Sequence, residues 1–162
     1  MKQILNRYQF DDMMVCYEIN EEKQVGLFLY PADMPLEKCA NSDTAIDSLV
    51  QLKIAGDMYN GAYAPGNTLR NGESTLRMKY VSQKLSEEKD IQTVITTMED
   101  DRGYQVIHKL YHVQGEKVLR VECEFLNKSA EPVKLEMFES VSLSEISPYI
   151  SGDEAGEIMV HR

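Results

Sequence analysis

The segment 104–126, YQVIHKLYHVQGEKVLRVECEFL, decides the fold class of the chain. In its second half apolar and charged residues alternate, which is typical of a strand with one buried face. The residues expected on that buried face are Leu119, Val121, Cys123 and Phe125. The first half is apolar on both faces, and the glycine-containing turn QGEK separates the two halves. The segment therefore predicts a β-hairpin whose first strand is central in a sheet and covered on both sides.

The same period of two recurs along most of the chain. Longer strands are predicted in LRMKYVSQKL, IQTVITTM and PVKLEMFESVSLSEI, and shorter ones in MMVCYEI, VGLFLYP and SLVQLKI. Helical patterns are weak, and only residues 35–47 have the composition for a turn or two of helix. With about eight or nine strands joined by short turns, the sequence predicts an all-β fold. The expected architecture is an antiparallel two-sheet sandwich, or supersandwich, with little helix.

Length and composition indicate one ordinary globular domain. The chain has 162 residues, of which 43% are hydrophobic and 27% charged. No apolar run approaches the roughly 20 residues that a membrane-spanning helix needs. The formal net charge of −10 would repel phosphates, so we expect neither a nucleic acid nor a membrane as a partner. The N-terminal segment becomes charged too early for a secretion signal, and a cytoplasmic location is expected.

The cysteines and the C-terminal stretch give two further expectations. Cys16, Cys39 and Cys123 are an odd set with no close spacing, which predicts reduced thiols rather than disulfides or a zinc site. At least two of them are expected in strands as small hydrophobic residues. The stretch SPYISGDEAGEIMVHR stops as another strand begins. We therefore expect residues 1–162 to be a single β-sandwich domain cut from a longer chain.

Histidines and carboxylates form no catalytic centre on sequence grounds. His108 and His112 share one face of a predicted strand at roughly 13 Å, too far apart to ligate one metal, and are expected to be structural or surface residues. The paired acids at 87–88, 99–101 and 122–124 fall at turns or on a polar strand face, where solvation accounts for them. No nucleophile elbow, phosphate-binding loop or HExxH motif is present. We expect no catalytic residue, no metal and no cofactor here.

Glu139 differs from the other acids, because the register places it on an apolar face between Met137 and Val141. One interpretation is a buried functional acid, with Arg77 as its partner. A β-bulge that turns Glu139 outward, or a sheet edge, is the commoner explanation.

The longest turn-rich stretch is 54–75, IAGDMYNGAYAPGNTLRNGEST, which holds four of the nine glycines and three asparagines. Tyrosine rings can stack on a pyranose, Asp and Asn can bond its hydroxyls, and glycines let the backbone approach a ligand closely. The candidate sugar-contact residues are Asp57, Tyr59, Asn60 and Tyr63. The alternative is a surface excursion whose tyrosines fold back onto the sheet.

At this stretch the chain resembles the N-terminal β-sandwich of glycoside hydrolase family 36, the α-galactosidases. The resemblance lies in DSLVQLKIAGDMYNGAYAPGNTLRNGESTLRMKYVSQKL, and VLRVECEFLNKSAEPVKLEMFESVSLSE is similar to later paired strands of that family. The residues that match its motifs are Ser48 to Gln51, Gly56, Asp57, Ala62, Tyr80 and Ser82. The likeness covers most of the chain from about residue 45, whereas residues 1–44 are only loosely similar.

Three positions depart from the family's loop motif. Met58 stands for a phenylalanine, Tyr59 for an arginine and Gly61 for a proline. The family's arginine contact near the sugar is therefore missing, and stacking by Tyr59 is expected to replace it.

The resemblance implies a sandwich that precedes a (β/α)8 barrel. Family members are retaining enzymes whose nucleophile and acid/base are two barrel aspartates, and they need no metal or cofactor. This chain is then expected to be non-catalytic, to contribute a loop near the sugar pocket, and to make contacts in a homo-oligomer. The expected partners are its own catalytic barrel and, through the full-length enzyme, α-galactoside oligosaccharides. The alternatives are an independent carbohydrate-binding or galactose-mutarotase-like sandwich, and a purely structural oligomerisation domain.

Overall fold

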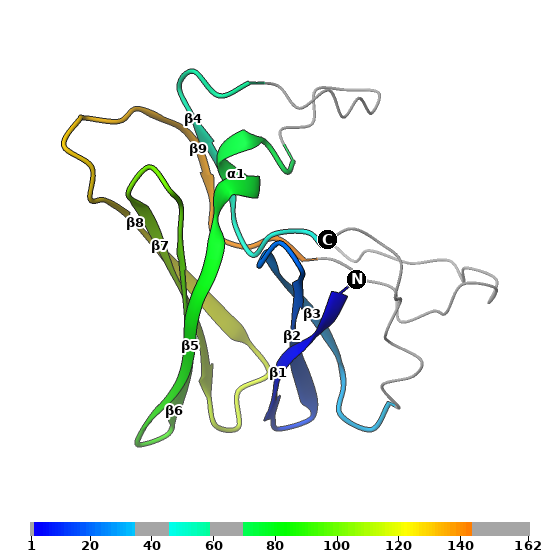
Figure 1. Cartoon of the computed structure of the whole chain (residues 1–162). Helices are drawn as coiled ribbons and strands as arrows, with labels where there is room; N and C mark the ends of the chain where they lie inside the picture. The colour runs from blue at the N-terminus through cyan, green and yellow to red at the C-terminus, as the bar shows by residue number, and fades with distance from the viewer. Residues whose placement is uncertain (1, 35–45, 59–69, 144–162) are drawn as a thin grey trace, which may run out of the picture.

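The computed structural model of the chain describes residues 2–34, 46–58 and 70–143. Nine strands and one short helix lie in these ranges (Figure 1). In chain order they are β1 (Lys2–Phe10), β2 (Met13–Asn20), β3 (Val25–Pro31), β4 (Gln51–Ile54), α1 (Glu73–Arg77), β5 (Lys79–Glu88), β6 (Ile91–Glu99), β7 (Tyr104–Val113), β8 (Leu119–Asn127) and β9 (Leu135–Glu139). No helix in the described part is long and apolar enough to cross a membrane.

The strands form three antiparallel sheets. Sheet A has the order β1-β2-β3, sheet B pairs β4 with β9, and sheet C has the order β5-β6-β7-β8. The hairpin predicted over 104–126 is formed by β7 and β8, with Val106 opposite Phe125 and Leu110 opposite Val121. The prediction of an all-β, antiparallel sandwich is therefore confirmed.

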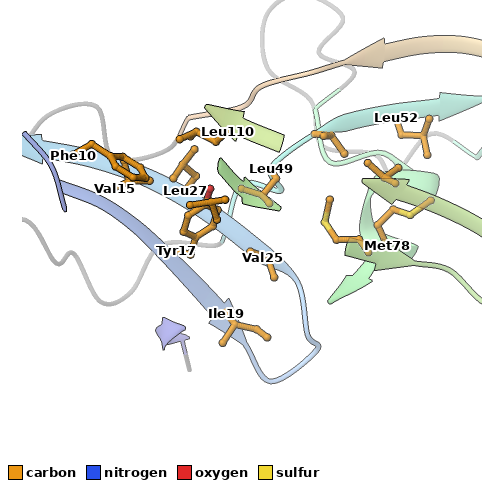
Figure 2. Packing of buried hydrophobic residues seen from close by; sticks show 14 of the residues in the cluster. Phe10, Val15, Tyr17, Ile19, Val25, Leu27, Leu49, Leu52, Met78 and Leu110 are labelled. Atoms are coloured by element: carbon orange, nitrogen blue, oxygen red, sulfur yellow. The ribbon is translucent and has the colours of Figure 1, made fainter. Parts of the chain in front are cut away.

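The hydrophobic core lies between sheet A and sheet C (Figure 2). Its fully buried members include Val15, Tyr17, Leu27, Val94, Met98, Val106 and Leu110. The four β8 residues predicted to face inward, Leu119, Val121, Cys123 and Phe125, pack against this cluster. Burying one large apolar side chain contributes about 1.5–3 kcal/mol, so this layer is the main attraction between the two sheets.

A polar contact also joins the two sheets. Gln83 of β5 accepts hydrogen bonds at Oε1 from Asn6 Nδ2 at 2.7 Å and from Tyr8 Oη at 3.1 Å, both from β1. Its Nε2 donates to Thr96 Oγ1 on β6 at 2.8 Å. The amide is thus satisfied from both sheets, and it fixes β1 opposite the β5–β6 pair.

The strand β7 is central in sheet C, as predicted, but its two faces are not equally covered. Its inward residues Val106, His108, Leu110 and His112 are buried, whereas the outward Ile107, Tyr111 and Val113 are half-buried. The prediction of cover on both sides was wrong for the outward face. The reason is that sheet A packs on the inward face only.

The strand β9 contains a bulge that the sequence alternation did not predict. Lys53 is opposite Met137 but Ile54 is opposite Leu135, so Glu136 is the extra residue. The bulge breaks the expected face: Phe138 packs on the core, while Leu135 is 38% exposed. Glu139 is exposed as a result. The bulge explanation for this residue is confirmed, and the buried functional acid is not.

Two elements were not predicted from the sequence. The first is β1, whose alternation is interrupted by a register shift between Ile4 and Asn6. The second is α1, a five-residue helix inside the turn-rich region that follows Gly72. The helical turns expected at 35–47 fall almost entirely outside the described residues.

The cysteine prediction holds where it can be examined. Cys16 on β2 is buried, Cys123 on β8 is partly buried, and both are free thiols in strands. Cys39 lies outside the described residues.

Candidate functional site

The candidate site is the turn-rich stretch 54–75, of which residues 54–58 and 70–75 are described. Of the four candidate sugar-contact residues only Asp57 is described; Tyr59, Asn60 and Tyr63 lie outside the described residues. We therefore examined what holds the two ends. Two groups of side chains do so, and we call them the first anchor (Asp57, Ser74, Asp100 and Arg102) and the second anchor (Asp47, Gln51, Arg70 and Asn71).

Asp57 forms the centre of the first anchor. Its Oδ2 accepts hydrogen bonds from the backbone N–H of Ile54 at 3.0 Å and of Ser74 at 3.3 Å, and its Oδ1 accepts one from Ser74 Oγ at 2.7 Å. The side chain is only 4% exposed. Burial works to raise the pKa of Asp57, but these hydrogen bonds and the charge of Arg102 outweigh it and leave the pKa lowered. Asp57 is thus ionised and ties β4 to the start of α1.

Arg102 completes the first anchor from the turn between β6 and β7. Its Nε donates to Asp100 Oδ2 at 2.7 Å, its Nη2 donates to Ser74 Oγ at 2.8 Å, and its Nη1 lies 3.5 Å from Asp57 Oδ1. The guanidinium also lies over the ring of Tyr104, 5.1 Å from the centroid. One guanidinium therefore compensates two buried carboxylates, and sheet C is tied to α1 and β4.

Asp100 itself is fully buried, with a side-chain exposure of 0%. Besides the bond from Arg102 Nε, its Oδ1 accepts the backbone N–H groups of Arg102 at 2.9 Å and Tyr104 at 3.0 Å. The sequence interpretation of 99–101 as solvated turn acids is wrong for Asp100 and holds for Asp101, which is 76% exposed. An Asp followed two residues later by Arg-Gly is a turn signal that could have identified it.

The second anchor holds the other end of the undescribed segment. Arg70 forms a two-pronged ion pair with Asp47, with Nε 2.5 Å from Oδ1 and Nη2 2.6 Å from Oδ2. Asn71 donates its backbone N–H to Gln51 Oε1 at 2.7 Å and its Nδ2 to Asp47 Oδ1 at 3.3 Å. Asp47 and Gln51 are both buried. Planar, paired donors of this kind restrict the direction as well as the position of the backbone.

A hollow of about 590 Å³ opens beside the first anchor. Its described lining residues are Met58, Glu73, Leu76, Arg77, Lys79 and Asp101. Three of the charged residues on its wall are paired with one another, because Arg77 bonds both Glu73 and Asp101. Glu73 Oε2 also accepts the Met58 N–H at 2.9 Å, and Lys79 Nζ donates to the carbonyl oxygen of Leu76 at 2.9 Å. Arg77 therefore bonds other acids and not Glu139. Glu139 lies opposite Gln51 in the register of β4 and β9.

The two histidines of β7 belong to the core. His108 is 0% exposed and His112 is 2% exposed, and both are on the inward face between the sheets. The prediction that they are structural is confirmed. Within the described ranges, no group of three or more His, Cys, Asp or Glu side chains is arranged to hold a metal ion.

Comparison with known proteins identifies no relative: no family model, curated protein or solved structure gives a significant match to the chain.

Proposed function

We propose that this chain is the non-catalytic β-sandwich of an α-galactosidase, and that residues 59–69 complete a sugar pocket formed by a separate catalytic barrel. The observation that carries the proposal is the pair of anchors. Buried Asp47 pairs with Arg70, buried Asp57 precedes Met58, and the Met58 N–H donates to the partly exposed Glu73; Met58 and Arg70 flank a segment rich in Tyr, Asn and Gly. Such anchoring is useful where a segment must meet a ligand at a defined place.

The chemistry of the segment supports a sugar as the ligand. Tyr59 and Tyr63 offer aromatic faces, and Asn60 offers both donors and acceptors for hydroxyl groups. Asp57, with both carboxylate oxygens engaged inside the chain, acts as a positioning residue; direct sugar contact by it stays a prediction. In this proposal the parent enzyme is cytoplasmic, assembles as a homo-oligomer, and acts on oligosaccharides with terminal α-galactose.

The proposal places the catalytic acids outside residues 1–162. Asp57 and Asp100 share the guanidinium of Arg102, and the lowered pKa of Asp57 makes that carboxyl a poor proton donor. The chain alone should therefore not hydrolyse a chromogenic α-galactoside. Turnover that disappears in Glu139→Gln would contradict the proposal.

Sequencing the genomic codons that follow Arg162 is the decisive experiment. A (β/α)8 barrel with two paired aspartates would support the proposal, whereas an unrelated domain or an immediate stop codon would overturn it. The full-length enzyme then allows a sharper test. Tyr59→Ala should raise KM for α-galactosides more than it lowers kcat, because the residue binds the ground state and the transition state alike.

Titration of this chain with galactose and raffinose distinguishes the proposal from the alternative, an independent carbohydrate-binding module. A segment that only completes a distant pocket should give almost no change in amide NMR shifts. Saturable shifts that are abolished in Tyr63→Ala, while the fold is retained, would favour the binding module. The remaining alternative is a purely structural oligomerisation domain. Size-exclusion chromatography of the chain without sugar tests it, because such a domain would already elute as an oligomer.

A further inference from the structure

The inward face of sheet C carries two buried histidines with different surroundings. His108 is fully buried, and neither Nδ1 nor Nε2 makes a hydrogen bond within the described part of the chain. Its register neighbours are Thr96 on β6 and Cys123 on β8. A buried polar group without a partner is costly, and a buried charge without one costs much more.

Among the described residues, the groups around His108 offer no negative charge that would neutralise a proton on its ring. The titratable residues of the layer between the sheets are Cys123 on β8, Tyr17 on β2, Tyr8 on β1, Tyr80 on β5 and Tyr104 on β7, together with His112 further along β7. Burial raises the pKa of Cys123 to about 12 and raises that of Tyr17 above its ordinary value. Both groups are therefore neutral in mild acid, and the described elements facing His108 supply no carboxylate.

The environment of His112 is different. Its Nε2 lies 3.1 Å from the carbonyl oxygen of Glu116 and 3.4 Å from Asp11 Oδ2, and its ring stacks on Phe10 at 5.1 Å. Asp11 lies in the turn between β1 and β2, and its Oδ2 also accepts the N–H of Gly115 at 2.9 Å. A proton on His112 would therefore create an ion pair between the turns of sheet A and sheet C.

We propose that the packing of sheet A on sheet C is sensitive to acid. A proton taken up by His108 favours separation of the two sheets, and the contact between Asp11 and His112 opposes that separation. This inference does not depend on the proposed function. It rests on the depth of His108, on its two unpartnered nitrogens, and on the carboxylate that His112 has and His108 lacks.

The sign of the pH effect follows from proton linkage. Burial lowers the pKa of His108 from 6.5 to about 4 in the folded chain. Between these values the unfolded state binds more protons than the folded state, so stability falls as the pH falls through this window. The unfolding equilibrium constant should rise by up to tenfold for each pH unit, on the order of a hundredfold across the window.

The test compares urea unfolding of the wild-type chain, His108→Phe and His112→Phe at pH 7, 6, 5 and 4.5, followed by near-UV circular dichroism. His108→Phe keeps the ring volume without a titratable nitrogen, so its midpoint should be nearly independent of pH in this window. His112→Phe removes the contacts with Asp11 and Glu116 but keeps His108, so its midpoint should still fall with acid, as that of the wild type does. Parallel curves for the wild type and His108→Phe would overturn the proposal.

A second measurement covers the case in which His108→Phe does not fold. The ring resonances of the histidines in the wild-type chain are followed by NMR from pH 8 to the unfolding transition. A ring that does not titrate until the sandwich opens supports the proposal. If all the histidine rings titrate near pH 6.5 in the folded chain, the proposal is wrong.

Discussion

Different interactions hold together the core between sheets A and C and the two anchors, which lie on either side of residues 59–69 in the sequence. The core is mainly a layer of apolar side chains that also contains His108 and His112, and the amide of Gln83 is hydrogen-bonded from both sheets. The anchors are built from buried carboxylates, each compensated by an arginine or by backbone N–H groups. Apolar attraction is non-directional, whereas paired ions fix angles and distances. The comparison suggests that the core supplies stability and the anchors supply position.

The largest effect is expected from a cavity in the core. Leu110 is 1% exposed, and Leu110→Ala should lower the free energy of unfolding by about 2–5 kcal/mol because it removes transfer energy and leaves a void. Urea unfolding followed by far-UV circular dichroism measures this. Val118→Ala is the control, since Val118 is 56% exposed and should change stability by less than about 0.5 kcal/mol. Equal effects of the two variants would mean that the core does not dominate stability.

The next effect distinguishes Asp100 of the first anchor from the neighbouring Asp101, which is not part of the anchor. Asp100→Ala leaves the backbone N–H groups of Arg102 and Tyr104 without an acceptor and should cost about 3 kcal/mol. Asp101→Ala, at the adjacent exposed position, is the matched control and should cost less than about 0.5 kcal/mol. Amide NMR shifts should change at Ser74 in the first variant only. A similar loss of stability in both variants would mean that Asp100 does not hold the first anchor together.

The sheets could be predicted from the sequence because their signal is local. Alternation over eight or ten residues assigns each side chain to a face, and the β7–β8 hairpin follows directly from it. The bulge at Glu136 could not be predicted, since it depends on how β9 meets β4, a strand far away in the sequence. One extra residue exchanged the two faces of the strand and moved Phe138 onto the core.

The anchors were largely missed for the same physical reason. Asp57 was selected for its place in a glycine-rich stretch, but its partners Ser74 and Arg102 come from other elements. The Arg-Gly that follows could have identified Asp100 as a turn residue, but its burial depends on α1 and β4, whose side chains come from elsewhere in the sequence. Tyr59, Asn60 and Tyr63 stay predictions that the described residues do not test.

A smaller effect should show that the first anchor and the core around His108 lose stability in different pH ranges. Asp57→Asn keeps the side-chain shape but removes the charge opposite Arg102, and should cost about 1–2 kcal/mol at pH 7. The lowered pKa of Asp57 means that its contribution is present above the ordinary value of 3.8 and is lost as the pH falls through the folded-state value. The difference between wild type and Asp57→Asn should therefore shrink only below about pH 3.8. A difference that vanishes already between pH 6.5 and 4, the window of His108, would show that Asp57 is not held as described.

The smallest effect is expected at Glu139, where the bulge has turned the acid to solvent. Glu139→Gln should change the free energy of unfolding by less than about 0.5 kcal/mol, since the side chain is exposed and its neighbours are not rearranged. Phe138→Ala is the matched comparison on the same strand and should cost distinctly more, because that ring packs at 6.2 Å against Phe125. Thermal unfolding of both variants measures the difference. A larger loss in Glu139→Gln than in Phe138→Ala would mean that β9 pairs with β4 without the bulge and presents its other face to the core.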